Sequence, residues 1–296
     1  MTDEDLHVDG EDDLYVDGDG ARWAFGTGFT DPLHGVDQSV PDGVDAEDLA
    51  ACCLALGDDA LVSAQRLAEW CTRAPELEEE LALANIGLDL LGQARLLYAR
   101  AGRADGTGRG EDAYAYFRYP EDFRNVRLAE LPGGDFAFTV ARLLVLSVWR
   151  LAVCEALAAA PDPVLAAIAA KSAKELAYHS RWAAEWTVRL GDGTGESAGR
   201  MRAALDALAP WLDELLTDRA AARQGADPAA VAARTRLELF HVLADAGLDR
   251  SDDVSPLETP APPVPGSGRN GRHTPHLAPL LAELQSVARA HPDASW

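Results

Sequence analysis

Residues 75–101 read PELEEELALANIGLDLLGQARLLYARA, and this stretch sets the architecture that we expect for the whole chain. Its apolar residues recur at three- and four-residue intervals, which predicts one long helix that is apolar on most faces. Asn85, Asp89 and Gln93 follow one another in four-residue steps, so they share one face of this helix. An Asp that faces the interior of a helix bundle is strongly destabilising unless something pairs with it. Whether Asp89 pairs with a metal ion or with a protein charge therefore decides what this protein does.

The composition excludes several classes of partner. The chain has 296 residues and a formal net charge of −23, of which residues 1–48 carry −14, from fifteen Asp and Glu against one Arg. Such an acidic chain is not expected to bind nucleic acid or an anionic membrane surface. We expect a cytoplasmic protein, because the N-terminus has no secretion signal, no run of apolar residues is long enough to span a membrane, and the four cysteines lack Cys-x-x-Cys spacing.

The lengths of the connections between the predicted helices indicate the topology. Four helices are predicted at residues 45–73, 75–101, 136–159 and 163–191. The first two are joined tightly, and so are the last two, whereas a long crossover at residues 103–134 separates the pairs. Two antiparallel hairpins linked by one long crossover are typical of the ferritin-like four-helix bundle. We therefore predict an all-α, ferritin-like fold with additional C-terminal helices.

The remaining segments complete the predicted organisation. Further helices are expected at residues 201–223 and from residue 228 to about residue 247. The predicted domains are an acidic N-terminal extension (1–44), a ferritin-like helical domain (45–250), a Pro/Gly-rich linker (251–272) and a C-terminal helix packing on the bundle (273–296). The crossover holds five aromatic residues, which either pack down on the bundle or dock a partner chain.

A ferritin-like bundle raises the question of a di-iron site. Such a site needs a Glu from each of two helices and Glu-x-x-His from each of the other two, all pointing inward. Glu69 on the first helix fits, but Asp89 is followed three residues later by Gly92, which cannot bind a metal. The third helix has no acidic residue before its end, and Glu175 is separated from His179 by four residues instead of three. We therefore expect no metal ligands and no catalytic residues in this chain.

Other histidine motifs are interpreted as structural. Glu238-x-x-His241 lies outside the four-helix core and has no second copy, and His273-x-x-His276 marks the start of a helix. A lone histidine is more often a structural residue than a metal ligand.

We hypothesise that protein charges replace the metal. Lys171, Glu175 and His179 step by four along one face of the fourth helix. A lysine ammonium from this helix, together with His179, would neutralise the carboxylates at the position of a metal. The predicted network comprises Glu69, Asp89, Lys171, Lys174, Glu175 and His179. The alternative is that both lysines face solvent and pair with surface acids.

Three stretches carry a resemblance to a known family. They are LGDDALVSAQRLAEWCTRAPELEEELALANIGLDLLGQAR (56–95), KSAKELAYHSRWAAEWTVRLGDGT (171–194) and HTPHLAPLLAEL (273–284). The chain resembles the C subunits of bacterial phenylacetyl-CoA epoxidases, which are multicomponent monooxygenases. The similarity extends over residues 54–220 and the C-terminal helix.

The resemblance implies a structural, non-catalytic subunit of a monooxygenase that epoxidises the ring of phenylacetyl-CoA with O2 and NADPH in aerobic phenylacetate catabolism. In that family a homologous A subunit holds the di-iron centre, a B subunit joins such pairs, and a reductase delivers electrons. This chain is then expected to bind no cofactor itself. Two alternatives remain: a di-iron oxygenase with unusual ligands, and a stand-alone helical interaction protein.

Overall fold

A computed structural model of the chain describes residues 33–248 and 264–294. The chain divides into two units, Met1–Gly35 and Val36–Trp296, and the architecture below is that of the second unit. Most of the predicted N-terminal extension and residues 251–263 of the predicted linker lie outside the described residues.

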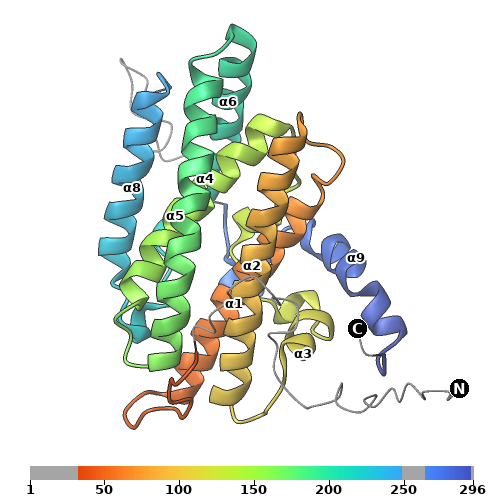
Figure 1. Cartoon of the computed structure of the whole chain (residues 1–296), viewed down its shortest axis with the longest axis vertical. Helices are drawn as coiled ribbons and strands as arrows, with labels where there is room; N and C mark the ends of the chain where they lie inside the picture. Colours follow the sequence, from red (N-terminus) through yellow and green to blue (C-terminus); the bar gives the residue numbers. More distant parts are fainter. Residues whose placement is uncertain (1–32, 249–263, 295–296) are drawn as a thin grey trace, which may run out of the picture. The chain divides into compact units, whose positions relative to one another are not determined.

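The second unit is built on four long helices arranged as two hairpins (Figure 1). Helix α1 (Ala46–Ala68) packs along α2 (Leu77–Ala104), and α4 (Phe136–Leu157) packs along α5 (Pro163–Gly191). Contacts between α2 and α5 join the two hairpins, and the long crossover connects α2 to α4. No described residue forms a strand. The all-α class predicted from helical periodicity is confirmed.

Aspartate caps set where three of these helices begin. The side chain of Asp135 accepts a hydrogen bond from the backbone N–H of Phe138, and that of Asp162 accepts one from Leu165. Asp45 caps α1 in the same way. Each cap satisfies a backbone donor that the first turn of a helix leaves without an intrahelical partner.

Helix α4 lies at the centre of the fold. Among the described helices it alone is long and apolar enough to span a membrane, but 83% of its most apolar window is buried inside the protein. Its apolar surface is therefore covered by the neighbouring helices of the same chain. In this fold α4 is a core helix.

The remaining helices cover the ends and sides of the two hairpins. They are α3 (Glu111–Tyr116), α6 (Gly195–Leu208), α7 (Leu212–Leu216), α8 (Pro228–Asp245) and α9 (Leu277–Ala290). Short 3-10 turns lie at Pro120–Asp122, Arg127–Glu130, Ala209–Trp211, Ala222–Gln224 and Gly268–Asn270.

Several predicted helix bounds differ from the structure, and the first helix, expected to reach residue 73, ends at Ala68. The helix expected at residues 201–223 starts earlier, at Gly195, where Thr194 forms a capping box with Ser197, and it ends at Leu208. Pro210 cannot donate a backbone hydrogen bond, so a 3-10 turn and the separate helix α7 follow. Helix α2 also continues through Gly102, which the sequence pattern suggested as its end.

The crossover folds over the bundle and divides its aromatic residues between the core and the surface. Tyr114 and Phe123 are 2% and 0% exposed, whereas Phe117 and Tyr119 are 44% and 61% exposed. The chain therefore uses part of the aromatic stretch for its own packing and leaves part of it at the surface.

Two adjacent buried aspartates in the middle of α1 hold the crossover in place. The Asp58 carboxylate accepts hydrogen bonds from Tyr98, from Arg118 and from the backbone N–H of Arg124. The Asp59 carboxylate accepts one from the backbone N–H of Val126 at 2.8 Å. A buried charge is tolerated when it is paired and hydrogen-bonded in this way.

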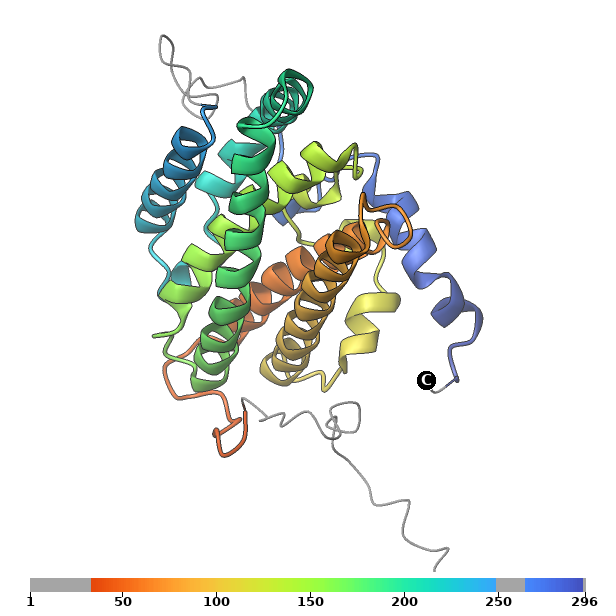
Figure 2. The same ribbon diagram turned by 45° about the horizontal axis from the view of Figure 1, so that its top comes forward.

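Asp59 and two glutamates also bind the C-terminal segment. Arg269 donates to both oxygens of Asp59, at 3.0 and 2.8 Å. Glu130 accepts from the backbone N–H of Thr274 and lies 2.6 Å from Nδ1 of His273, while Glu214 accepts from the backbone N–H of Gly268. Helix α9 then runs beside α3 at the edge of the molecule (Figure 2).

The four cysteines predict a simple labelling result. Cys52, Cys53 and Cys154 are buried, whereas Cys71 is exposed. Burial raises the pKa of Cys52 to about 12 and that of Cys154 to about 11, so neither forms the reactive thiolate near neutral pH. We expect a thiol reagent at pH 8 to modify Cys71 alone in the folded protein and all four cysteines in denaturant. Rapid labelling of a second cysteine in the native protein would contradict the burial of Cys52, Cys53 and Cys154.

Candidate functional site

Helices α2 and α5 meet at a polar contact between Asp89 and His179. Nε2 of His179 lies 3.0 Å from Oδ2 of Asp89. The His179 side chain is fully buried, whereas that of Asp89 is 39% exposed. Because an ionised carboxylate can only accept hydrogen bonds, Nε2 carries the proton and donates it to Asp89. Asp89 therefore lies at the rim of the bundle and fixes the orientation of an imidazole that lies inside it.

A second set of contacts runs from the surface into the core. Lys171 forms an ion pair with Glu175 one helical turn away. Glu175 also accepts a hydrogen bond from Nε2 of Gln93 at 3.0 Å, and Oε1 of Gln93 accepts one from Arg150 at 3.0 Å. Arg150 extends across to α1, where it donates to the carbonyl of Leu56. We call Asp89, Gln93, Arg150, Lys171, Glu175 and His179 the central polar network.

Three residues singled out in the sequence lie outside this network. Glu69 is at the end of α1, where it pairs with Arg66 at 2.5 Å. Lys174 and Asn85 are exposed, and the described residues provide no ion pair for Lys174. The stripe of Asn85, Asp89 and Gln93 thus passes from the surface into the core, because each four-residue step along a helix also rotates by about 40°.

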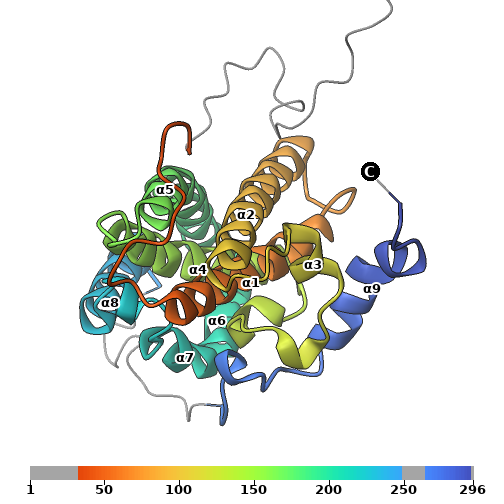
Figure 3. The same ribbon diagram turned by 90° about the horizontal axis from the view of Figure 1, so that it is seen from below.

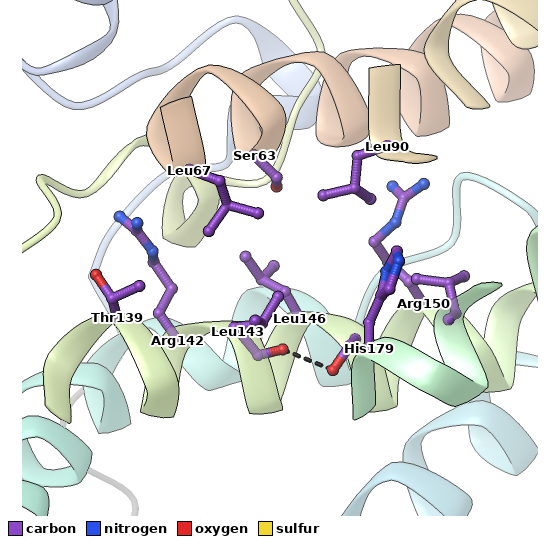
Figure 4. A pocket seen from close by; sticks show the side chains of 11 residues that line it. Ser63, Leu67, Leu90, Thr139, Arg142, Leu143, Leu146, Arg150 and His179 are labelled. Carbon is purple, nitrogen blue, oxygen red and sulfur yellow. Dashed lines mark hydrogen bonds between the residues drawn. The ribbon is translucent and has the colours of Figure 1, made fainter. Parts of the chain in front are cut away.

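A small cavity lies beneath the network, between α1, α2, α4 and α5 (Figure 4). Its volume is about 20 Å³, and leucine side chains form much of its wall. Three buried polar atoms on its lining residues have no hydrogen-bond partner within the described part of the chain: Oγ of Ser63, Nε of Arg150 and Nδ1 of His179. A cavity of this size with several polar partners can hold one water molecule.

The charges around the cavity are unsuited to a metal cation. Arg142 and Arg150 line it, and no Asp or Glu does. Burial lowers the pKa of Arg142 to about 10, which still leaves its guanidinium charged at neutral pH. Within the described residues, no group of three or more His, Cys, Asp or Glu side chains is placed to hold one metal ion. The residues present do not match the donor set of a carboxylate-bridged di-iron site.

The other histidine motifs have structural surroundings. His273 is held between Glu130 and the carbonyl of Phe123, so both of its ring nitrogens have partners. Glu238 and His241 are exposed on α8.

Sequence reasoning missed the arginines of the core. Arg142 and Arg150 lie on α4. The sequence of this helix is so apolar that its two buried arginines give no periodic polar pattern that would mark them as members of a site. The adjacent Asp58 and Asp59, in an otherwise apolar stretch of α1, were a usable signal, because buried acids require buried bases.

Comparison with known proteins identifies the family of the chain. Residues 36–296 match the family described as Phenylacetic acid catabolic protein. The chain belongs to this family. It is 42% identical over 254 residues to the C subunit of the 1,2-phenylacetyl-CoA epoxidase of Escherichia coli (strain K12), an alignment that covers 84% of this chain and 99% of that protein. Membership in the Phenylacetic acid catabolic protein family confirms both the resemblance noted in the sequence and the ferritin-like fold class.

Proposed function

We propose that this chain is the structural, non-catalytic subunit of a cytoplasmic phenylacetyl-CoA 1,2-epoxidase. The observation that carries the proposal is the 42% identity to an epoxidase C subunit across 99% of the length of that protein. The complex would epoxidise the aromatic ring of phenylacetyl-CoA with O2 and NADPH. Its di-iron centre would lie in a homologous catalytic subunit that this chain supports, with a bridging subunit and a reductase completing the assembly.

The central polar network supports the non-catalytic role. Each carboxylate that a metal would need already has a protein partner: Asp89 has His179, and Glu175 has Lys171 and Gln93. The guanidinium of Arg150 reaches the same region from α4 and would repel a bound cation. The charges that could have served a metal site thus neutralise one another within the chain.

Metal analysis of purified proteins tests the proposal. We expect the chain expressed alone to carry no stoichiometric iron, and its complex with the homologous catalytic subunit to carry iron and to epoxidise phenylacetyl-CoA when supplied with the reductase. Asp89→Asn should leave the iron content of that complex unchanged, because Asp89 would not be a ligand. The matched control is the same analysis of the catalytic subunit expressed alone.

Two results would overturn this assignment. A stoichiometric pair of iron atoms in this chain alone, lost on Asp89→Asn, would make it a di-iron oxygenase with unusual ligands. Failure to form any complex with the catalytic subunit would favour a stand-alone helical interaction protein.

A further inference from the structure

Helix α2 carries a row of exposed leucines along its outer side. Leu77, Leu81 and Leu88 are 66%, 56% and 64% exposed, and Leu91 is 37% exposed. Isolated exposed leucines are common on protein surfaces, but a continuous row on one helix marks an interaction site. In the described part of the chain no element covers this side of α2, which lies between α5 and α3 when seen from below (Figure 3).

The spacing of these residues is that of a coiled coil. Leu77, Leu81, Ala84, Leu88 and Leu91 are separated alternately by four and three residues. This alternation keeps the side chains in a narrow seam along one side of the helix, the arrangement that packs lengthwise against a second helix. A helix that only contacts the core of its own chain has no need of such a seam on its outer surface. We call these five residues the α2 seam.

Gly92 gives an independent sign of a neighbour from outside the chain. It lies in the interior of α2, where glycine destabilises a helix relative to alanine. Apart from the neighbouring backbone of α2 itself, a Cβ atom at this position would have no atom of the described chain within 4 Å, so the chain's own packing does not require a glycine there. Gly92 follows Leu91 and lies one turn after Leu88. A small residue beside a seam lets the backbone of a second helix approach closely.

We propose that the α2 seam docks a long amphipathic helix of the homologous catalytic subunit, in coiled-coil geometry, with the closest approach at Gly92. The identity of the partner rests on the function proposed above. The first turns of α2 carry Glu76, Glu78, Glu79 and Glu80 around the start of the seam. The docked helix is therefore basic at the end that meets these glutamates.

Charge argues against a second copy of this chain as the occupant. With a net charge of −23, two copies repel each other. A parallel pair of α2 helices would place the two glutamate clusters together. An antiparallel pair would offer Arg95 to the partner's glutamates, but Arg95 already donates two hydrogen bonds to Glu111. A partner with its own basic residues would neither repel the glutamates of α2 nor depend on Arg95 to pair with them.

Binding assays with the full-length chain and the purified catalytic subunit test the proposal. Leu88→Gln should weaken binding by about 30-fold or more, the range typical of a central interface anchor. Gly92→Ala should weaken binding by about tenfold, as a methyl group does in a close-packed contact, and should leave the thermal unfolding midpoint unchanged or raised. A gain or no change in stability together with a loss of affinity is a result that a purely structural role of Gly92 cannot produce.

The controls remove similar groups elsewhere on the surface. Phe240→Gln removes an apolar side chain that is 48% exposed on α8. Gly199→Ala fills open space at a helical glycine on α6. Both should bind the catalytic subunit like the wild type.

The binding assays distinguish three results that would contradict the proposal. Normal binding by Leu88→Gln and Gly92→Ala would overturn the α2 seam as the docking site while leaving the proposed function intact. Absence of binding by the wild type would overturn the pairing itself. Self-association of the wild type that Leu88→Gln abolishes would identify a second copy as the occupant and so overturn the proposed partner.

Discussion

Asp59→Asn is expected to lower the free energy of unfolding by about 3–5 kcal/mol, the usual cost of breaking a buried ion pair from one side. Asp59 is 0% exposed and binds Arg269 through both carboxylate oxygens. Burial opposes ionisation of Arg269, but the carboxylates of Asp59 and Asp218 outweigh it and raise the Arg269 pKa. An amide at position 59 would leave Asp218 as the one carboxylate paired with Arg269 and would remove the Asp59 carboxylate that lies 3.8 Å from Arg150.

Urea unfolding followed by circular dichroism measures this effect. The matched control is Asp48→Asn on the same helix, which also breaks an Asp–Arg pair, but one in which the Arg223 side chain is 74% exposed. Solvent screens that pair, so the unfolding midpoint should not change measurably. An equal shift for the two variants would contradict the central structural role of Asp59.

Asp59 also connects the fold to the central polar network. Arg150 lies between Asp59 on α1 and Gln93 on α2, so the position of its guanidinium depends on both helices. Loss of Asp59 should therefore loosen the contacts of Gln93 and Glu175, which are more than thirty residues away in the sequence. Stability and the arrangement of the candidate site are coupled through this one arginine.

The helices of the fold were predictable because their signals are local. Asp135 and the Asp162-Pro163 pair mark helix starts by their own chemistry, and the lengths of the connections distinguish two hairpins from an up-and-down bundle. The signals failed where tertiary contacts decide. Gly102 lies inside α2, where the carbonyl of Arg109 packs so closely against it that a side chain would clash, a contact that no local pattern indicates.

The candidate site was predictable only along single helices. Lys171 and Glu175 are four residues apart on α5, so their ion pair follows from helical geometry. The contact between Asp89 and His179 depends on the relative rotation of the two hairpins, which a single helix does not reveal. The contact of Arg150, on α4, with Gln93 depends on the same rotation. Glu69 has the right residue type, but it lies at the C-terminal end of α1, where it pairs with Arg66 instead of joining the network.

Asp162→Ser is expected to cost about 3–5 kcal/mol of folding free energy, even though serine is also a good helix cap. Asp162 has two roles: it caps α5 through the backbone N–H of Leu165, and it forms a fully buried ion pair with Arg100 of α2. Arg100 in turn donates to the carbonyls of Gln38 and Ser39 and so fastens the segment before α1 to both hairpins. The serine variant keeps the cap and removes only the charge, which separates the two roles.

A double-mutant cycle with Arg100→Met gives the decisive measurement. Each single substitution leaves one buried charge without its partner, whereas the double variant leaves none. The double variant should therefore be more stable than the sum of the two losses predicts, by about 2 kcal/mol or more, within the range that contacting residues show. Strictly additive losses would mean that the ion pair contributes nothing beyond the cap and the two carbonyl contacts. In that case the hairpins would be held at this end by apolar packing alone.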